Sequence, residues 1–474
     1  MAFARSLALT HTNLGQTAER VIELVDEARE RGRRVLIFVT GVPGSGKTLT
    51  GLQVVHGAIE SGVETDDDIV YLSGNTPLVT VLREALARDK YRRAGQAGED
   101  VRIGELRSAM RTKIQHIIDY LQEYLVNDTS RAPAEHVVVF DEAQRAWDAK
   151  FGEQRFERPA SEPQLLIEIM TRHPNWCALV CLVGGGQEIN TGENGMAEWG
   201  QALRNVPSDV AKEWTVMGPE EVVLGGETTG GLGLGQLPTE VEVVNEDALR
   251  LTVPMRSFRS PAVSGWVRAV IDGDAALAAS EAARLSEYPI VVTRSLGAAR
   301  HWLKMKARGE RRCGLLSSSG ARRLRAEGMG VTLNATDGIK IAQWYLNPPD
   351  DVRSSFALEV MANEYTSQGL ELDFCGICWG GDFLWDSDGW SLKSFRGNRW
   401  DNVSKPDRRR FVRNSYRVLL TRAREGIVIW VPRGSSADAT RAPGRLDGTF
   451  QMLLACGAME LVEGDAYRDP LQEL

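Results

Sequence analysis

The 474-residue sequence contains few cysteines and no long apolar run. Six cysteines are too few for a disulfide framework in a chain of this length, and their spacing does not form a four-ligand zinc pattern. No stretch reaches the apolar length of a membrane span, and the N-terminal residues lack the apolar core and cleavage site of a signal peptide. We therefore expect a cytoplasmic protein that does not contact a membrane.

Two pairs of cysteines are closely spaced. Cys375 and Cys378 form a C-x-x-C within the strand-like run LDFCGICW, and Cys177 and Cys181 lie in the apolar run CALVCLV. A metal or redox site is the alternative interpretation of the first pair. Small residues buried in strands explain both runs more simply.

An excess of basic residues is also absent overall, because the net charge is -8. This balance excludes a uniformly basic nucleic-acid coat but not a local basic groove. Between residues 405 and 424 there are eight basic residues against one acidic residue, Asp407. Such runs are often solvated helix faces, so on charge alone nucleic-acid contact stays open.

The length predicts two large domains, because a single hydrophobic core stops growing well below this size. Strand-like and helix-like segments alternate in both halves, which favours an α/β fold with parallel sheets flanked by helices. We expect a helix at residues 16–32, a charged surface excursion at 88–113 and a helix beginning at 114. The glycine-rich segment at 217–240 is either a flexible, ligand-gated loop near the domain boundary or an inert insertion.

A phosphate-binding loop follows the first predicted strand and precedes a helix, the context that such a loop needs. In such a loop, backbone N-H groups surround the β-phosphate of a nucleoside triphosphate, so we expect Lys47 to reach the β- and γ-phosphates and the Thr48 hydroxyl to ligate Mg²⁺. A glycine-rich turn without a ligand is the less favoured alternative. The pattern G-x-x-x-x-G-K-[ST] consists of Gly41, Val42, Pro43, Gly44, Ser45, Gly46, Lys47 and Thr48.

An acidic pair ends the apolar run VVVF and supplies the second element that phosphate-loop enzymes need. Asp141 is the predicted magnesium partner, and Glu142 is predicted to orient or deprotonate the attacking water. The alternative is a helix N-cap with an acid in the first turn.

With Ala143 and Gln144, this pair resembles the D-E-x-Q box of superfamily 1 helicases, and further motifs follow in the order of those motors. The resemblance implies two RecA-like P-loop NTPase domains that bind ATP and Mg²⁺ between them. It implies a lead-in at residues 1–33, a first domain at 34–250 and a second at 251–474. The implied roles are nucleotide contact by Gln144, Gly369 and Glu371, γ-phosphate sensing by Gln187 and by Arg256 (Arg259 as the alternative), and an arginine finger at Arg422 rather than Arg424.

Four segments resemble the bacterial DNA/RNA helicase domain shared with Schlafen proteins: LSGN-PLV, GGGQEI-TGE, TSQGLELD and LLTRAR. We therefore expect an ATP-dependent helicase or translocase on single-stranded DNA or RNA, with no nuclease module in the first 33 residues. The alternative is a nucleotide-switched regulatory ATPase, in phage defence for example, that signals to a protein partner. Most of the twelve tryptophans are expected in the core, and none is singled out for base stacking. The candidates are Trp199, Trp266, Trp379 and Trp385.

Overall fold

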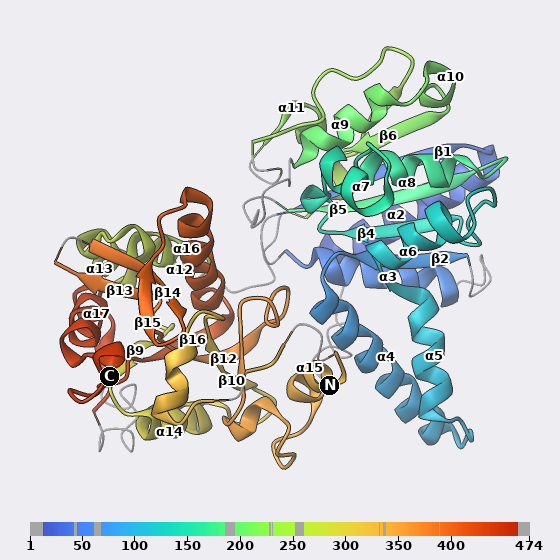
Figure 1. Cartoon of the computed structure of the whole chain (residues 1–474). Coiled ribbons are helices and arrows are strands. Elements are labelled where there is room, and N and C mark those ends of the chain that lie inside the picture. The colour runs from blue at the N-terminus through green and yellow to red at the C-terminus, as the bar shows by residue number, and fades with distance from the viewer. Residues whose placement is uncertain are drawn as a thin grey trace. The chain divides into compact units, whose positions relative to one another are not determined.

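The computed structural model describes residues 13–41, 45–60, 68–184, 195–226, 229, 231–251, 260–330, 332–334, 338–387 and 389–462 (Figure 1). The chain divides into two compact units, Met1–Met255 (unit 1) and Arg256–Leu474 (unit 2). Each unit has a parallel sheet with helices around it, so the predicted α/β class is confirmed. Among the described residues, no helix is both long and apolar enough to cross a membrane.

The sheet of unit 1 has the strand order β3-β2-β4-β5-β1-β6-β7, and β8 also pairs with β1. Neighbouring strands are parallel. The central strands are apolar along their length because helices cover both faces of a parallel sheet. The strands are β1 (Arg34–Gly41), β2 (Ile69–Ser73), β3 (Ile114–His116), β4 (Val137–Asp141), β5 (Cys177–Val183), β6 (Trp214–Gly218), β7 (Glu242–Asn245) and β8 (Arg250–Leu251).

The helices of unit 1 connect these strands. The predicted first helix is confirmed as α2, whose apolar face of Val21, Leu24, Val25 and Ala28 is buried, and Gly32 follows its end at φ 60°. The helices are α2 (Asn13–Arg31), α3 (Lys47–Glu60), α4 (Thr76–Ala97), α5 (Ile103–Lys113), α6 (Ile117–Gln122), α7 (Ala149–Phe156), α8 (Glu162–Thr171), α9 (Met196–Asn205), α10 (Ser208–Ala211) and α11 (Glu221–Leu224).

Two predicted segments of unit 1 lie between β2 and β4. The predicted charged surface excursion, 88–113, is mostly exposed and is helical, because α4 continues to Ala97 and α5 follows after a short turn at Gly98, whose φ is 78°. The predicted start of the next helix at 114 is wrong. Residues 114–116 form the edge strand β3 instead of the first turn of a helix. The open edge of β2 accounts for this difference, since Tyr71 pairs with Ile114 and the Ile114 side chain becomes buried.

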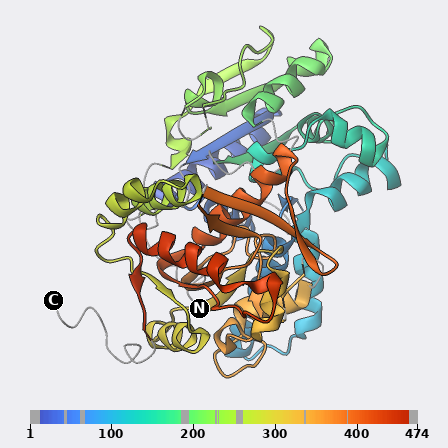
Figure 2. The same ribbon diagram turned by 60° about the vertical axis from the view of Figure 1, so that its left-hand side comes forward.

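The main sheet of unit 2 has the order β11-β10-β12-β16-β9-β17, with parallel neighbours. A separate antiparallel sheet, β13-β14-β15, packs beside α16 (Figure 2), where the rings of Phe383 and Tyr416 lie 4.9 Å apart. The strands are β9 (Ile290–Thr293), β10 (Cys313–Ser317), β11 (Met361–Ala362), β12 (Leu372–Cys378), β13 (Phe383–Asp386), β14 (Gly389–Arg396), β15 (Arg399–Asn402), β16 (Ala423–Trp430) and β17 (Met459–Glu460). The helices are α12 (Ser260–Asp272), α13 (Ala275–Ala282), α14 (Leu296–Lys306), α15 (Gly338–Leu346), α16 (Pro406–Leu420) and α17 (Pro443–Ala455).

The closely spaced cysteines lie in buried strands. Cys375 and Cys378 are on β12, Cys177 and Cys181 are on β5, and all four are buried as free thiols. Burial raises the pKa of Cys378 to about 12, so this thiol is a poor nucleophile. Within the described ranges, no group of three His, Cys, Asp or Glu side chains could hold a metal ion.

Candidate nucleotide site

Three neighbouring strands of unit 1 bring the predicted nucleotide-binding segments to one edge of the sheet. β5 pairs with β1 on one side and with β4 on the other. Because parallel strands end at the same edge, Gly41, Asp141 and Gly184 all lie at the carboxyl-terminal edge. Ligands of open α/β sheets bind outside this edge.

In the described part of the phosphate loop, Gly41 and Ser45 lie close together. A β-carbon at Gly41 would lie 2.4 Å from the Ser45 Oγ, so only glycine fits there. Gly46 has a φ of 96°, which favours glycine. The remaining predicted loop residues, Val42, Pro43 and Gly44, lie outside the described residues.

Lys47 begins α3, and its side chain turns back over the sheet edge. Its Nζ donates a hydrogen bond to the Gly41 carbonyl oxygen at 2.7 Å. A β-carbon at Gly184 would lie 2.6 Å from the same Nζ. The ammonium is therefore held between the ends of β1 and β5, and glycine at position 184 is a condition of that placement.

Asp141 joins the acidic box to the phosphate-loop helix. Its Oδ2 accepts a hydrogen bond from the Thr48 hydroxyl at 3.0 Å and another from the Tyr71 hydroxyl at 2.6 Å. Burial and the neighbouring Glu142 carboxylate raise the pKa of Asp141, while these two hydroxyls and Lys47 lower it. The structure thus places the two predicted magnesium ligands, Thr48 and Asp141, within hydrogen-bonding distance of each other.

Glu142 has a backbone conformation that residues with a side chain rarely adopt, at φ 56° and ψ 41°. Gln144 fixes its carboxylate, because the Gln144 Nε2 donates to the Glu142 Oε2 at 2.6 Å. The Gln144 Oε1 accepts from the Gly184 amide at 3.0 Å. Gln144 therefore links the acidic box to the end of β5, and the unusual backbone at Glu142 is of the kind that is found at functional sites.

Two supporting residues were not predicted for this site. Tyr71 stands out in the sequence only as an aromatic residue in the strand next to β4, and Trp199 comes from a helix 58 positions beyond Asp141. The Trp199 Nε1 donates to the Ala143 carbonyl oxygen at 2.8 Å, and its ring is fully buried. No local sequence pattern indicates this contact.

Three of the four candidate tryptophans for base stacking are core residues, namely Trp199, Trp266 and Trp379. All three rings are fully buried, and the indole N-H groups of Trp266 and Trp379 donate to backbone carbonyls. Trp385 is partly exposed and makes an edge contact with Trp390. An indole ring has one polar atom, its N-H group, so a single backbone acceptor is enough to satisfy it in the core.

The described residues fit a triphosphate and a divalent cation. The Ser45 hydroxyl is buried and has no hydrogen-bond partner among the described residues, so it can donate to an anion. The Lys47 ammonium adds positive charge at the same place. A hydroxyl and a carboxylate at 3.0 Å, Thr48 and Asp141, form the oxygen donor set that Mg²⁺ takes.

In unit 2, the predicted arginine finger lies at the junction of α16 and β16. The helix ends at Leu420, so neither Arg422 nor Arg424 is a residue of α16. Arg422 is buried and its Nε donates to the Val418 carbonyl at 3.0 Å. Arg424 is exposed on β16 and its Nε donates to the Glu371 carboxylate at 3.1 Å.

The other predicted contacts lie partly beyond the described residues. Gly369 adopts a φ of 71°, which explains glycine at this turn before β12. Gln187, Arg256 and Arg259 lie outside the described residues.

Unit 2 buries two carboxylates at the carboxyl-terminal edge of its sheet. Asp382 accepts hydrogen bonds from the Ser318 hydroxyl at 2.6 Å and the Tyr416 hydroxyl at 2.9 Å. Glu364 accepts from the Ser319 amide and hydroxyl and from the Ser415 hydroxyl, at 2.8, 2.6 and 3.1 Å. The donors lie after β10 and on α16, so these hydrogen bonds connect α16 to the ends of the strands.

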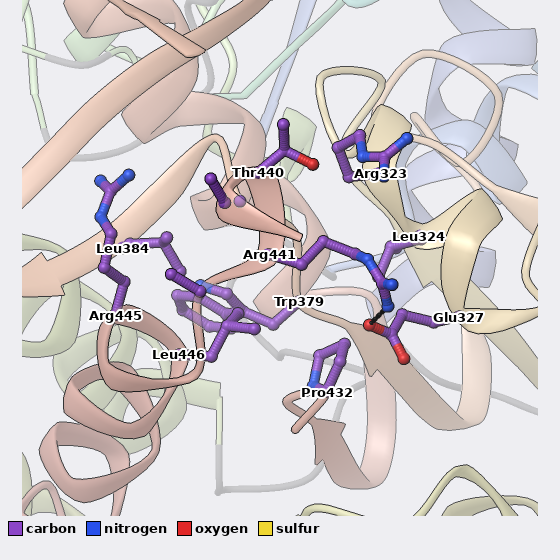
Figure 3. Close-up of a pocket in the computed structure, with 13 residues that line it drawn as sticks. Arg323, Leu324, Glu327, Trp379, Leu384, Pro432, Thr440, Arg441, Arg445 and Leu446 are labelled. Carbon is purple, nitrogen blue, oxygen red and sulfur yellow. Dashed lines mark hydrogen bonds and ion pairs between the residues drawn. The ribbon is translucent and has the colours of Figure 1, made fainter. Parts of the chain in front are cut away.

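A small pocket lies near the same edge of unit 2 (Figure 3). Its volume is about 30 Å³, enough for about two water molecules. Its arginines are already paired, Arg441 with Glu327 and Arg323 with Asp438. The pocket therefore has neither the room nor the unpaired charge for a nucleotide.

The fold and the site define a class, namely an α/β protein with a phosphate-loop sequence at the end of one parallel strand and an acidic box two strands away. The profile of the Schlafen group 3 DNA/RNA helicase domain matches residues 34–433, and the chain belongs to this family. The resemblance expected from the motifs is confirmed by this match.

Among solved structures, the crystal structure of the DUF1998 helicase MrfA bound to DNA is similar at 11% sequence identity and a TM-score of 0.30. The similarity covers 90% of this chain and 50% of that one, so the chain spans about half the length of that helicase. A likeness at this level does not extend to function. No curated protein matches the chain.

Proposed function

We propose that this protein is an ATP-driven helicase or translocase acting on single-stranded DNA or RNA. Membership of the helicase-domain family supports a motor of this type. The observation that carries the proposal is the contact between Thr48 and Asp141 at 3.0 Å, next to the buried Lys47. This arrangement suits a triphosphate with Mg²⁺, which neutralises developing charge when it is bound.

Each residue of the site has a role in the proposed hydrolysis. Lys47 and the loop hydroxyl of Ser45 bind the phosphates, and Thr48 and Asp141 hold Mg²⁺. Glu142 orients or deprotonates the attacking water, with its carboxylate held by Gln144 at 2.6 Å. The water would then be placed by a side chain that is fixed before the substrate arrives.

The proposed motor has its first RecA-like domain at residues 34–250 and its second at 251–474. Arg422, with Arg256, would complete the charge stabilisation from the second domain, and Gln187 would sense the γ-phosphate. Gly369 and Glu371 would contact the nucleotide. Closure of the two domains on ATP would then be coupled to movement along the nucleic acid.

ATP hydrolysis by the purified protein tests the proposal, measured alone and with single-stranded DNA, single-stranded RNA or duplex. Lys47→Ala is the control for contaminating activity. We expect a several-fold stimulation by at least one single-stranded polymer, absent in the variant. Robust hydrolysis that is indifferent to every polymer would instead support a nucleotide-switched regulatory ATPase with a protein partner.

A further inference from the structure

The exposed face of α16 in unit 2 is strongly basic. Six basic residues lie between positions 405 and 417, against the single acid Asp407. Arg409 donates to the Val403 carbonyl, Arg408, Arg410 and Arg417 are exposed, and Arg413 is half-buried. We define the α16 basic surface as Arg408, Arg410, Arg413 and Arg417 together with Phe411 and Tyr365.

The positive charge of this surface is poorly compensated. Arg410 reaches Asp407 only at 3.9 Å, and both side chains are more than half exposed. Among the described residues, none forms an ion pair with Arg408 or Arg413, and Arg417 contacts only the neutral Asn414. Concentrated, uncompensated positive charge of this kind attracts a polyanion.

An aromatic pair lies within the same surface. Tyr365, from the turn after β11, is 43% exposed and stacks on Phe411 of α16, with ring centroids 5.9 Å apart and planes 28° apart. An exposed ring that packs on this basic helix offers a face on which an unpaired base can stack. Bases in a duplex do not expose that face, so the surface favours a single strand.

The surface is rigidly supported from beneath. Glu364, the residue before Tyr365, accepts a hydrogen bond from Ser415 on α16 at 3.1 Å. Asp382 accepts another from Tyr416 on the same helix at 2.9 Å. These buried contacts fix both the helix and the turn that carries Tyr365, so little ordering is needed when a ligand binds.

We propose that the α16 basic surface binds single-stranded nucleic acid, with its arginines on the phosphates and Tyr365 stacked on a base. The proposal rests on the proposed function, since it assigns a part of the track to unit 2. The expected ligand is a polynucleotide, because its phosphates can pair with the arginines and its unpaired bases can stack on the exposed ring.

The test compares two triple variants that remove the same charge. The first is Arg410→Gln with Arg413→Gln and Arg417→Gln. The control is Arg284→Gln with Arg311→Gln and Arg353→Gln, three exposed arginines of unit 2 that each have an acidic partner. Binding of labelled oligothymidine and oligouridine is measured by fluorescence anisotropy over a range of KCl concentrations.

We expect the first variant to bind about ten-fold or more weakly at about 0.1 M salt, with a salt slope lower by about 2, since each lost phosphate contact removes about 0.7. The control should keep the wild-type slope. Tyr365→Ala should weaken binding about ten-fold without changing the slope, and Tyr365→Phe should bind like the wild type. Thermal melting of each variant verifies folding.

An unchanged slope and affinity in the first variant, with hydrolysis still stimulated by the polymer, overturns this inference alone. Equal binding of polyglutamate, with the same sensitivity to the first variant, also overturns it in favour of an acidic protein. If the wild type binds neither oligonucleotide and its hydrolysis ignores both, the proposed function fails as well.

Discussion

Unit 1 and unit 2 both bury carboxylates at the carboxyl-terminal edge of a parallel sheet, and the surroundings of those carboxylates differ. Asp141 in unit 1 lies near the Lys47 ammonium, and the buried Ser45 hydroxyl nearby lacks an acceptor among the described residues. In unit 2, Asp382 and Glu364 accept hydrogen bonds from protein hydroxyls and an amide, with no lysine or arginine among those donors.

This difference is the one we expect between the proposed nucleotide site and a structural network. Where a buried donor has no acceptor among the described residues, as at Ser45, an anion would complete the arrangement, because buried polar groups are normally paired. Where donors and acceptors match, the network holds the fold together. The position of a carboxylate at a strand end therefore does not decide its role. The match between hydrogen-bond donors and acceptors around it does.

The largest expected effect is at Arg422, the buried arginine of unit 2 that we propose as the arginine finger. Arg422→Ala should reduce ATP turnover by about 10³-fold or more while nucleotide binding is kept, as for other arginine fingers. Turnover and fluorescent-nucleotide titration measure the two properties. Arg311→Ala, which loses only an ion pair with Glu425 at the surface of unit 2, is the control. Turnover within a few-fold of wild type in Arg422→Ala would remove unit 2 from the catalytic scheme.

The next prediction compares one glutamate from each unit. Glu142→Gln should lower kcat by about 10²- to 10⁴-fold with little change in melting temperature, because it removes the proposed base. Glu364→Gln should instead lower the unfolding free energy by about 1–3 kcal/mol, since an amide cannot accept all the hydrogen bonds of the carboxylate. Steady-state kinetics and calorimetry of both variants give the result. A stability loss in Glu142→Gln equal to that of Glu364→Gln would break the comparison.

The stability of unit 2 should depend on the ionisation of Asp382. Burial raises the pKa of Asp382 from 3.8 to about 6. The folded state therefore holds this proton more tightly than the unfolded chain does, so its stabilising contribution is present below about pH 4 and is lost as the pH rises through 6. Between about pH 4 and pH 7 the loss amounts to about 3 kcal/mol.

Asp382→Asn cannot ionise and should remove this part of the pH dependence. Chemical denaturation of the wild type and the variant across this pH range provides the measurement. Parallel curves for the two proteins would show that the carboxylate ionises as freely in the folded state as in the unfolded chain.

The smallest effect concerns the second hydroxyl on Asp141. Tyr71→Phe removes a hydrogen bond that lowers the pKa of Asp141, so the acid limb of the hydrolysis pH profile should move upward by less than about one pH unit. Tyr120→Phe is a matched control, because its buried hydroxyl contacts only the Met170 sulfur at 3.6 Å. An identical shift in both variants would assign the effect to general loosening of the core.

Local patterns predicted the elements that build the site. The apolar strand before Gly41, the strand ending at Asp141 and the helix beginning at Lys47 are visible because composition and turn residues specify them locally. The structure also joins the two predicted magnesium ligands, Thr48 and Asp141. Their roles in hydrolysis stay predictions.

The features that sequence reasoning missed depend on distant partners. Residues 114–116 form a strand because the edge of β2 is free, which no window of neighbouring residues reveals. The indole of Trp199, one of the candidates for base stacking, is held in the core by a single backbone acceptor, the Ala143 carbonyl. The end of α16 at Leu420 places Arg422 in a helix-strand junction, although the apolar pattern of the segment continues into β16.

The glycine at position 184 gives a simple way to sort the relatives of this protein. Since a β-carbon there would lie 2.6 Å from the Lys47 nitrogen, any homologue with a larger residue at this position must hold its lysine elsewhere. Position 184 opens the segment GGGQEI, so a replacement there changes this segment while the phosphate loop and the acidic box keep their sequences. One letter therefore divides homologues into those that can hold the lysine against the end of β5 and those that hold it elsewhere.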